Sequence, residues 1–411
     1  MSAVEVRIEN RLKSNLLLPT LLWTMFLTFT IIVFLSTLLV DIAPSFHVSI
    51  GTASAMMLVA SIMGLITGLI MSALTIRFEH KYLLLIGIVF FVVGVLGLFF
   101  APTFNLALLS QAFIGVGSST IGILVFCLIG DLLPLEKRGF AVGLTISMAM
   151  FAWIIVAPLS GFIETIAGWR SVLTWFIFPI AIGGLILTLA VIPSKPHPNQ
   201  STEKSLYSEA FKRILLNKSA VACLVGTALV WIFNSVPVYT VSFYRIQFLV
   251  APVTGGLFGA IAAVGGMLGG ATGGRLVNRY GRKPLTVTAG LVAGAFAILI
   301  TFVPNVWLSV ASWVVSATSV GIMSAAFISL VLEQVPQFRG SMMSINDTFR
   351  AAGVIVGSTL GVVVLNPLNI QVANFQLLMV IYGSAGIVTA LIVLLLVRDP
   401  TKSQLPNQSK A

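Results

Sequence analysis

The segment Gly274-Arg-Leu-Val-Asn-Arg-Tyr-Gly-Arg-Lys283 lies between two long apolar runs, and Ser72-Ala-Leu-Thr-Ile-Arg-Phe-Glu-His-Lys81 lies between two others. Arg77 and Arg279 are 202 positions apart, and so are the lysines that end the two segments. Short basic loops that recur at one offset indicate a chain made of two related halves.

A second pair of loops repeats in the same way. Asp131-Leu-Leu-Pro-Leu-Glu-Lys-Arg-Gly139 resembles Glu333-Gln-Val-Pro-Gln-Phe-Arg-Gly340, and the Arg-Gly pairs match at an offset of 201. Two separate loops that repeat at nearly the same offset make chance similarity a poor explanation. The repeat therefore extends over both halves of the chain.

The composition excludes most classes of soluble protein. Of the 411 residues, 58% are hydrophobic and 9% are charged, whereas soluble chains have about 45–50% and about 25%. Such a chain has too few charges to cover its apolar surface in water, so a soluble enzyme, a coiled coil and a disordered protein are disfavoured. The net charge of +11 does not indicate nucleic-acid binding, because the basic residues lie in short loops between apolar runs.

The apolar runs are long enough to cross a bilayer, which takes about 20 residues. Backbone groups in lipid must be paired within the segment, so each run is expected to be a helix. The predicted spans are 17–40, 51–74, 83–101, 105–130, 140–163, 171–192, 220–243, 253–273, 285–303, 306–331, 341–365 and 374–397. The first run is interpreted as a span and not as a removed signal peptide, because no small-residue cleavage site follows it.

Charge predicts the orientation of these spans. If both termini are cytoplasmic, the outside loops hold only Arg170 and Arg245, and Arg350 lies within a span, which leaves 20 of the 23 Lys and Arg residues inside. This asymmetry is typical of multi-pass proteins of the cytoplasmic membrane with both ends inside.

The predicted organisation is all-α, with two six-helix bundles related as parallel repeats. The bundles are 1–192 and 220–398, joined by a cytoplasmic linker at 193–219 and followed by a polar tail at 399–411. Within the linker, Ser205 to Asn217 has the apolar pattern of a short surface helix. Transporters with such repeats bind their substrate between the halves near the middle of the membrane.

On these residues the chain resembles the major facilitator superfamily, whose loop signature G-x-L-a-D-R-x-G-R-K is similar to residues 274–283. The run Ala157-Pro-Leu-Ser-Gly161 also resembles a helix 5 element of the twelve-helix drug:proton antiporters in the drug and sugar efflux branch. The resemblance implies a secondary transporter that works by alternating access, with efflux and proton antiport as its expected mode.

Some positions depart from the family pattern. The first loop has Ser72, Ile76 and Glu79 where the signature has Gly, Asp and Gly, and Gln111 stands where the antiporters carry a helix 4 arginine that is linked to proton coupling. Proton coupling would then need another titratable group. An importer or uniporter of a small metabolite or organic anion is the open alternative.

Charged residues within or capping the spans are the main candidates for binding substrate or a proton. Asp347 lies about 9 Å into its span at about 1.5 Å per residue, and Arg350 lies one turn deeper. The two can share a helix face, either as a cavity-facing site or as a self-neutralising pair. Asp41 caps the outer end of the first span, as a protonation site or a plain interface residue.

Neutral polar residues recur on the spans expected to line a cavity, and they suggest a neutral or weakly polar organic substrate. Gln111, Asn234 and Tyr239 are the candidates among them, and Thr28, Ser118, Trp313 and Ser316 belong to the same set. Tyr and Trp offer an apolar face with one polar group. Most Ser and Thr residues in such helices only satisfy backbone carbonyls.

The repeated loops are predicted to form a cytoplasmic gate. Arg77 would meet Asp131, and Arg279 would meet Glu333, in one access state, and both pairs would separate in the other. The alternative is that these residues only set the membrane topology and contact lipid. The gate set is completed by Lys81, Arg282 and Lys283. Ala157, Pro158 and Gly161 are predicted to set a hinge or a static kink, because proline removes a helix hydrogen bond.

No catalytic residues, metal site or cofactor are expected. Cys127 and Cys223 lie inside apolar runs, and His47, His80 and His197 lie in loops far apart in sequence. The expected partners are a small-molecule substrate, the lipid bilayer and protons, with no nucleic acid and a monomeric chain.

Overall fold

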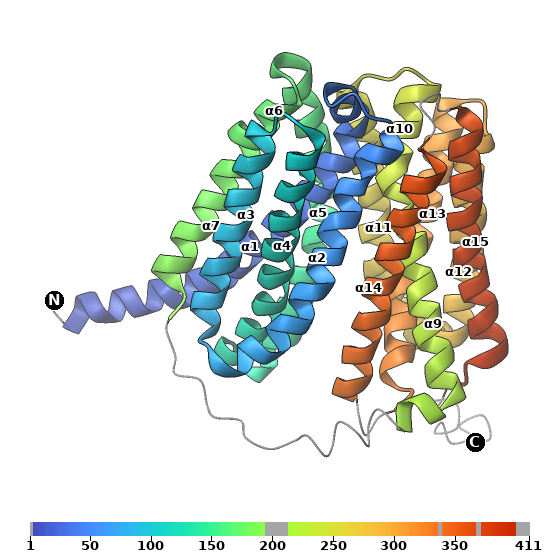
Figure 1. The fold of residues 1–411 in the computed structure, drawn as a ribbon. Coiled ribbons are helices and arrows are strands. Elements are labelled where there is room, and N and C mark those ends of the chain that lie inside the picture. Colours follow the sequence, from blue (N-terminus) through green and yellow to red (C-terminus); the bar gives the residue numbers. More distant parts are fainter. Residues whose placement is uncertain (1–2, 194–212, 336–338, 367–370, 400–411) are drawn as a thin grey trace, which may run out of the picture. The chain divides into compact units, whose positions relative to one another are not determined.

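The computed structural model describes the chain except for residues 1–2, 194–212, 336–338, 367–370 and 400–411. Every element of the described part is a helix, and twelve spans are long and apolar enough to cross a membrane (Figure 1). The all-α membrane fold predicted from hydropathy is confirmed.

The chain divides into two compact units. The first holds Met1–Gln200 together with Ala251–Leu257, and the second holds Ser201–Val250 and Phe258–Ala411. Of the expected linker helix at Ser205 to Asn217, residues 213–216 are helical and 205–212 lie outside the described residues.

The first unit contains six spans built from eight elements. They are α1 (Ala3–Ser45), α2 (Ile50–Arg77), α3 (His80–Phe100), α4 (Phe104–Leu132), α5 (Leu135–Ala167), α6 (Trp169–Val172), the π-helical η1 (Leu173–Ile177) and α7 (Phe178–Val191). Helix α3 packs on α4 and α7, α2 packs on α4, and α1 packs on α5. The short elements α6, η1 and α7 together make one span, Trp169–Val191.

The second unit contains the other spans. They are built from α9 (Lys218–Phe233), α10 (Val236–Gln247), α11 (Pro252–Tyr280, whose first residues belong to the first unit), α12 (Arg282–Phe302), α13 (Val306–Leu332), α14 (Arg339–Val364) and α15 (Val372–Leu396). Helix α12 packs on α13 and α15, and α9 packs on α14 and α15. The span predicted at 220–243 as one helix consists of two, α9 and α10, with a break at residues 234–235.

Glycines allow these helices to approach closely. A β-carbon added at Gly94 of α3 would lie 2.8 Å from the backbone nitrogen of Ile114 in α4, and one at Gly294 of α12 would lie 2.7 Å from the side chain of Ile387 in α15. Because lipid gives no hydrophobic force between helices, close packing of this kind holds the bundles together.

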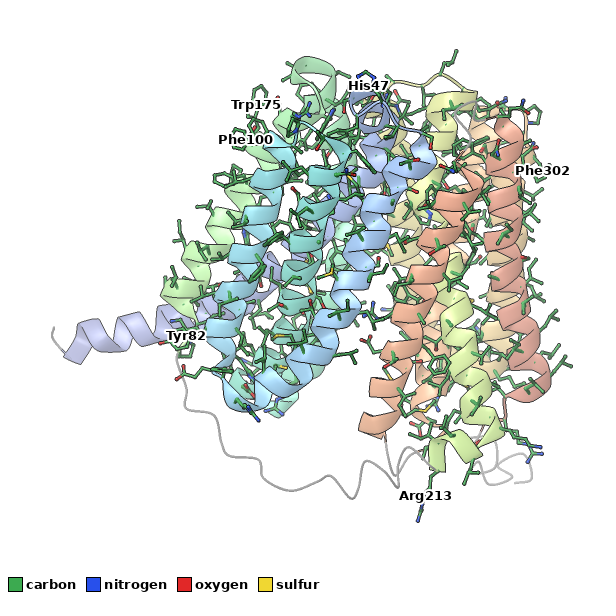
Figure 2. The ribbon with its side chains drawn as sticks, in the orientation of Figure 1. His47, Tyr82, Phe100, Trp175, Arg213 and Phe302 are labelled. Carbon is green, nitrogen blue, oxygen red and sulfur yellow. The ribbon has the colours of Figure 1, made fainter. Side chains whose placement is uncertain are left out.

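Aromatic residues lie at both ends of the first unit. Figure 2 places Phe100 and Trp175 at the end that carries His47, and Tyr82 at the opposite end. Phe100, Trp175 and Tyr82 are each more than half exposed. Exposed aromatic side chains at helix ends are typical of the two membrane–water interfaces.

Candidate functional site

The break in the seventh span puts polar groups at a helix joint in the second unit. Helix α9 ends at Phe233 and α10 begins at Val236. Pro237 has no N–H, so the carbonyl of Phe233 lacks its usual donor four residues later. Asn234 lies at this joint, half-buried, and its N–H donates to the carbonyl of Val230 over 2.8 Å. Interrupted spans with freed backbone groups are typical of transporter binding sites.

Helix α14 packs tightly against α9 and α10 through glycines one turn apart. A β-carbon at Gly353 would lie 2.9 Å from the β-carbon of Trp231, one at Gly357 would meet the hydroxyl of Ser235, and one at Gly361 would meet the ring of Tyr239. The side chain of Thr227 also donates to the amide oxygen of Asn346 over 2.5 Å. This packing fixes the position of α14 relative to α9.

Asp347 and Arg350 form an ion pair on α14. Nε of Arg350 donates to Oδ1 of Asp347 over 2.5 Å, and Nη2 donates to Oδ2 over 3.2 Å. The Asp347 side chain is 64% exposed and the Arg350 side chain 40%. Both lie within the apolar stretch Ile345–Val364. Because lipid cannot solvate a carboxylate, this face of α14 must be in contact with water or polar groups.

Trp231 joins this pair from α9. The guanidinium carbon of Arg350 lies 5.2 Å from the centre of the Trp231 ring, the geometry of a cation–π contact. Trp231 is one helical turn before Asn234, the residue that caps α9, so both lie on one side of the end of this helix. Trp231 was not among the residues predicted to bind substrate. An indole face, a guanidinium, a carboxylate and an amide therefore lie along one part of the second unit.

The other substrate candidates lie elsewhere. Gln111 of α4 is fully buried, and neither atom of its amide has a hydrogen-bond partner among the described residues. Tyr239 is 1% exposed and stacks on Tyr382 with ring centres 6.0 Å apart, so it lies inside the second unit. Asp41 is half-buried near the end of α1, which continues to Ser45, beyond the predicted end of that span at residue 40.

The neutral polar set mainly satisfies local groups. Thr28 donates to the carbonyl of Met25, Ser316 donates to the carbonyl of Ala293, and Trp313 is buried beside Tyr244. The hydroxyl of Ser118 is buried without a partner among the described residues. Ser118 is seven residues after Gln111, so the two lie on the same face of α4, two turns apart.

Two of the predicted gate lysines occupy matching positions in the two units. Nζ of Lys81 donates to the carbonyl of Leu189 near the end of α7 over 3.1 Å. Nζ of Lys283 donates to the carbonyl of Val397, the residue that caps α15, over 2.7 Å. A cation at a helix C-terminus satisfies the last carbonyls and suits the helix dipole. Each lysine therefore ties a repeated loop to the last helix of its unit.

The carboxylate of Asp131 has a partner that was not predicted from the sequence. Its Oδ2 lies 2.6 Å from Nδ1 of His80. The other predicted gate residues lie at helix ends. Arg77 is exposed at the end of α2, and Arg279 lies over the ring of Tyr280. Arg282 begins α12, and Glu333 caps α13. The latch between these arginines and acids stays a prediction. The repeat could have identified His80, because this residue stands 202 positions before the predicted gate residue Arg282.

The predicted hinge residues lie at a close backbone contact within the first unit. A β-carbon at Gly161 would lie 2.6 Å from the carbonyl carbon of Pro252, and one at Gly256 would meet the carbonyl oxygen of Ala157. Pro158 lies inside α5 between these contacts. The small residues are thus required for packing, and the hinge stays a prediction.

Comparison with known proteins agrees with this architecture. The family model of the Major Facilitator Superfamily matches residues 21–273 and 267–411. The uncharacterized MFS-type transporter YbcL of Bacillus subtilis (strain 168) is 21% identical over 379 residues, which is 90% of this chain and 92% of that protein. The probable sugar efflux transporter of Pasteurella multocida (strain Pm70) is 23% identical over 331 residues, 79% of each chain.

A solved structure gives the same result for the fold. The crystal structure of a D-xylose–proton symporter superposes with a TM-score of 0.77 at 18% identity, covering 94% of this chain and 98% of that one. The family match spans both units, and the twelve spans and the repeated loops are those of the same fold. The chain belongs to the Major Facilitator Superfamily.

Proposed function

We propose that this protein moves a small organic molecule out of the cell across the cytoplasmic membrane by alternating access, with both termini in the cytoplasm and protons as the coupling ion. The observation that carries the proposal is the Asp347–Arg350 pair, which lies exposed on a membrane-spanning helix beside Trp231. Ionisable groups in such segments mark substrate and proton pathways.

The chemistry of the site supports a neutral or weakly polar substrate. Arg350 already neutralises Asp347, so the pair presents donors and acceptors without a large net charge. The face of Trp231 offers apolar contact to a flat or ring-shaped molecule. The sugar efflux transporter and the D-xylose–proton symporter named above support sugars and related small organic molecules as the first substrates to test.

Asp347 is the group proposed to carry the coupling proton. Protonation of its carboxyl would release Arg350, and ionisation would restore the pair, so one proton changes the donors that the site offers to a substrate. Gln111 cannot titrate, which leaves Asp347 and Asp41 as the carboxylates proposed for coupling.

Flux in reconstituted vesicles tests the proposal. Full-length protein is placed in proteoliposomes, and movement of a panel of labelled sugars and small organic molecules is measured with and without an imposed pH gradient. Wild-type protein should accumulate a substrate against its gradient when protons flow the other way. Asp347→Asn should abolish this pH-driven movement and keep downhill exchange, whereas Arg350→Ala should lower both, because it leaves the carboxylate without its partner.

Asp347→Glu is the matched control, because it keeps a titratable carboxyl and should retain pH-driven transport. Normal uphill transport by Asp347→Asn would remove Asp347 from coupling and leave Asp41 for the same test. Full activity of both Asn variants would mean that the protein is a uniporter.

A further inference from the structure

The start of α3 holds a histidine between two acceptors. Nδ1 of His80 lies 2.6 Å from Oδ2 of Asp131, and Nε2 lies 3.3 Å from the carbonyl oxygen of Thr75. Thr75 belongs to α2 and Asp131 to α4, so this one ring connects three helices. The His80 side chain is 9% exposed, whereas Asp131 is 47% exposed.

The Asp131 carboxylate and the Thr75 carbonyl are both acceptors, so two hydrogen bonds to them need one proton more than a neutral imidazole has. A carbonyl oxygen only accepts hydrogen bonds, and so does an ionised carboxylate, whereas a neutral imidazole has one donor nitrogen and one acceptor nitrogen. Both contacts are satisfied if the ring is an imidazolium, or if Asp131 is protonated and donates to Nδ1. In either arrangement the pair holds one proton more than a neutral histidine beside a carboxylate.

We propose that His80 and Asp131 form a proton-binding site that clamps the α2–α3 connection to α4 when it is protonated. The site lies in the first unit, and it is separate from the Asp347–Arg350 pair on α14 of the second unit. Histidine is the side chain whose charge ordinarily changes between about pH 5 and 8. The clamp therefore tightens in acid and loosens when the proton leaves.

Two described cations near this connection are bound to backbone carbonyls. Lys81 donates to the carbonyl of Leu189, and Arg138 donates to the carbonyl of Leu133. Arg77 is exposed at the end of α2. Glu79, the residue before His80, has one carboxylate oxygen buried without a partner among the described residues.

The repeat gives the residues of the second half that match His80 and Asp131. The offset of 202 places Arg282 opposite His80 and Glu333 opposite Asp131. Arginine stays charged at every physiological pH, whereas histidine does not. At this position the first loop therefore has a cation that can lose its charge near neutral pH, and the second loop has one that cannot.

Nitrogen NMR on full-length protein with ¹⁵N-labelled histidine detects the proton directly. The chain has three histidines, so single His→Gln variants assign the signals. At pH 6 both ring nitrogens of His80 should carry protons, and at pH 8 one of them should not. A His80 ring with one protonated nitrogen at pH 6, whose signals do not change between pH 6 and pH 8, would overturn the proposal.

Thermal unfolding of the same protein tests the clamp without any substrate, so its outcome is independent of the proposed transport. Wild-type protein should lose more thermal stability between pH 6 and pH 8 than His80→Arg, which keeps its charge. The folding equilibrium should differ about two- to fivefold between these proteins at pH 8, as for a partly exposed ion pair. Asp131→Asn should remove the same pH dependence.

His47→Gln is the matched control, because His47 is an exposed histidine at the opposite end of the first unit (Figure 2). It should keep the wild-type pH dependence. If His80→Arg and wild-type protein respond equally to pH, the contact is a pH-independent packing contact and the proposal is wrong.

Discussion

His47 and Leu249 have the same left-handed backbone conformation, and they are 202 positions apart. Their φ angles are 55° and 51°, and no other described residue except glycine has a positive φ. Each follows the first span of its six-helix half. The repeat seen in the basic loops therefore extends to the backbone of the turns at the other end of the spans.

Leucine is a poor residue for this conformation, so Leu249→Asn should stabilise the protein. The left-handed region costs an L-residue about 1–2 kcal/mol, and asparagine tolerates it better. Leu249 is 85% exposed, so little packing is lost. We expect the free energy of unfolding to rise by about 1 kcal/mol, measured by thermal unfolding. Leu249→Val should lower it, because a β-branched residue fits this region worst; equal effects of Asn and Val would contradict the argument.

Gly353 should not tolerate a side chain. A β-carbon there meets the carbonyl of Ala228 and lies 2.9 Å from the β-carbon of Trp231, so Gly353→Ala must push α14 away from α9. The expected loss is about 1–3 kcal/mol of stability. Transport should fall as well, because Trp231 and Arg350 no longer meet. Gly143→Ala on α5 is the control, since no atom lies within 4 Å of its added β-carbon and alanine suits a helix better.

The buried amide of Gln111 is expected to lower the free energy of unfolding, and transport is expected to need it. Neither of its polar atoms has a partner in the described part of the chain, and such a group costs about 1–3 kcal/mol. Gln111→Met should therefore raise the unfolding temperature and, if the amide binds substrate, lower transport in the same vesicles.

Gln334 provides the comparison for Gln111. It donates to the carbonyls of Leu330 and Arg398 and accepts from Ser219, so Gln334→Met should be destabilising. A loss of stability in both variants would show that Gln111 has partners in the membrane that the described contacts do not include.

Thiol labelling tests the orientation of the spans. Figure 2 places His47 and Tyr82 at opposite ends of the first unit. In whole cells, a membrane-impermeant maleimide should label His47→Cys from outside and should label Tyr82→Cys only after the membrane is opened. Cys127 and Cys223 are replaced by serine beforehand. The reverse pattern would invert the topology that the basic loops predict.

Hydropathy predicted the spans well because each segment must satisfy its own backbone in lipid. The third span, predicted at 83–101, is observed at His80–Phe100, and the tenth, predicted at 306–331, is observed at Val306–Leu332. The break at residues 234–235 was missed, because Asn234 and Ser235 are flanked by apolar residues on both sides. Pro237 was the available signal.

The site was harder to predict than the fold. Asp347 and Arg350 are three residues apart, so helix geometry alone predicted that they could meet. Trp231 lies 119 positions from Arg350, and only the glycine packing of α14 on α9 brings the two together. His80 was overlooked because its sequence position suggested a loop, whereas it begins α3, and because its match to Arg282 in the repeat was not used.

The joint between α9 and α10 also bears on the source of energy for movement. Asn234 has φ −63° and ψ −3°, and Ser235 has φ −76° and ψ −12°. Both pairs of angles lie close to the helical region, so neither residue shows backbone strain. The bend in the seventh span is therefore not a store of backbone strain, and any motion of this span would need free energy from another source, such as a bound solute.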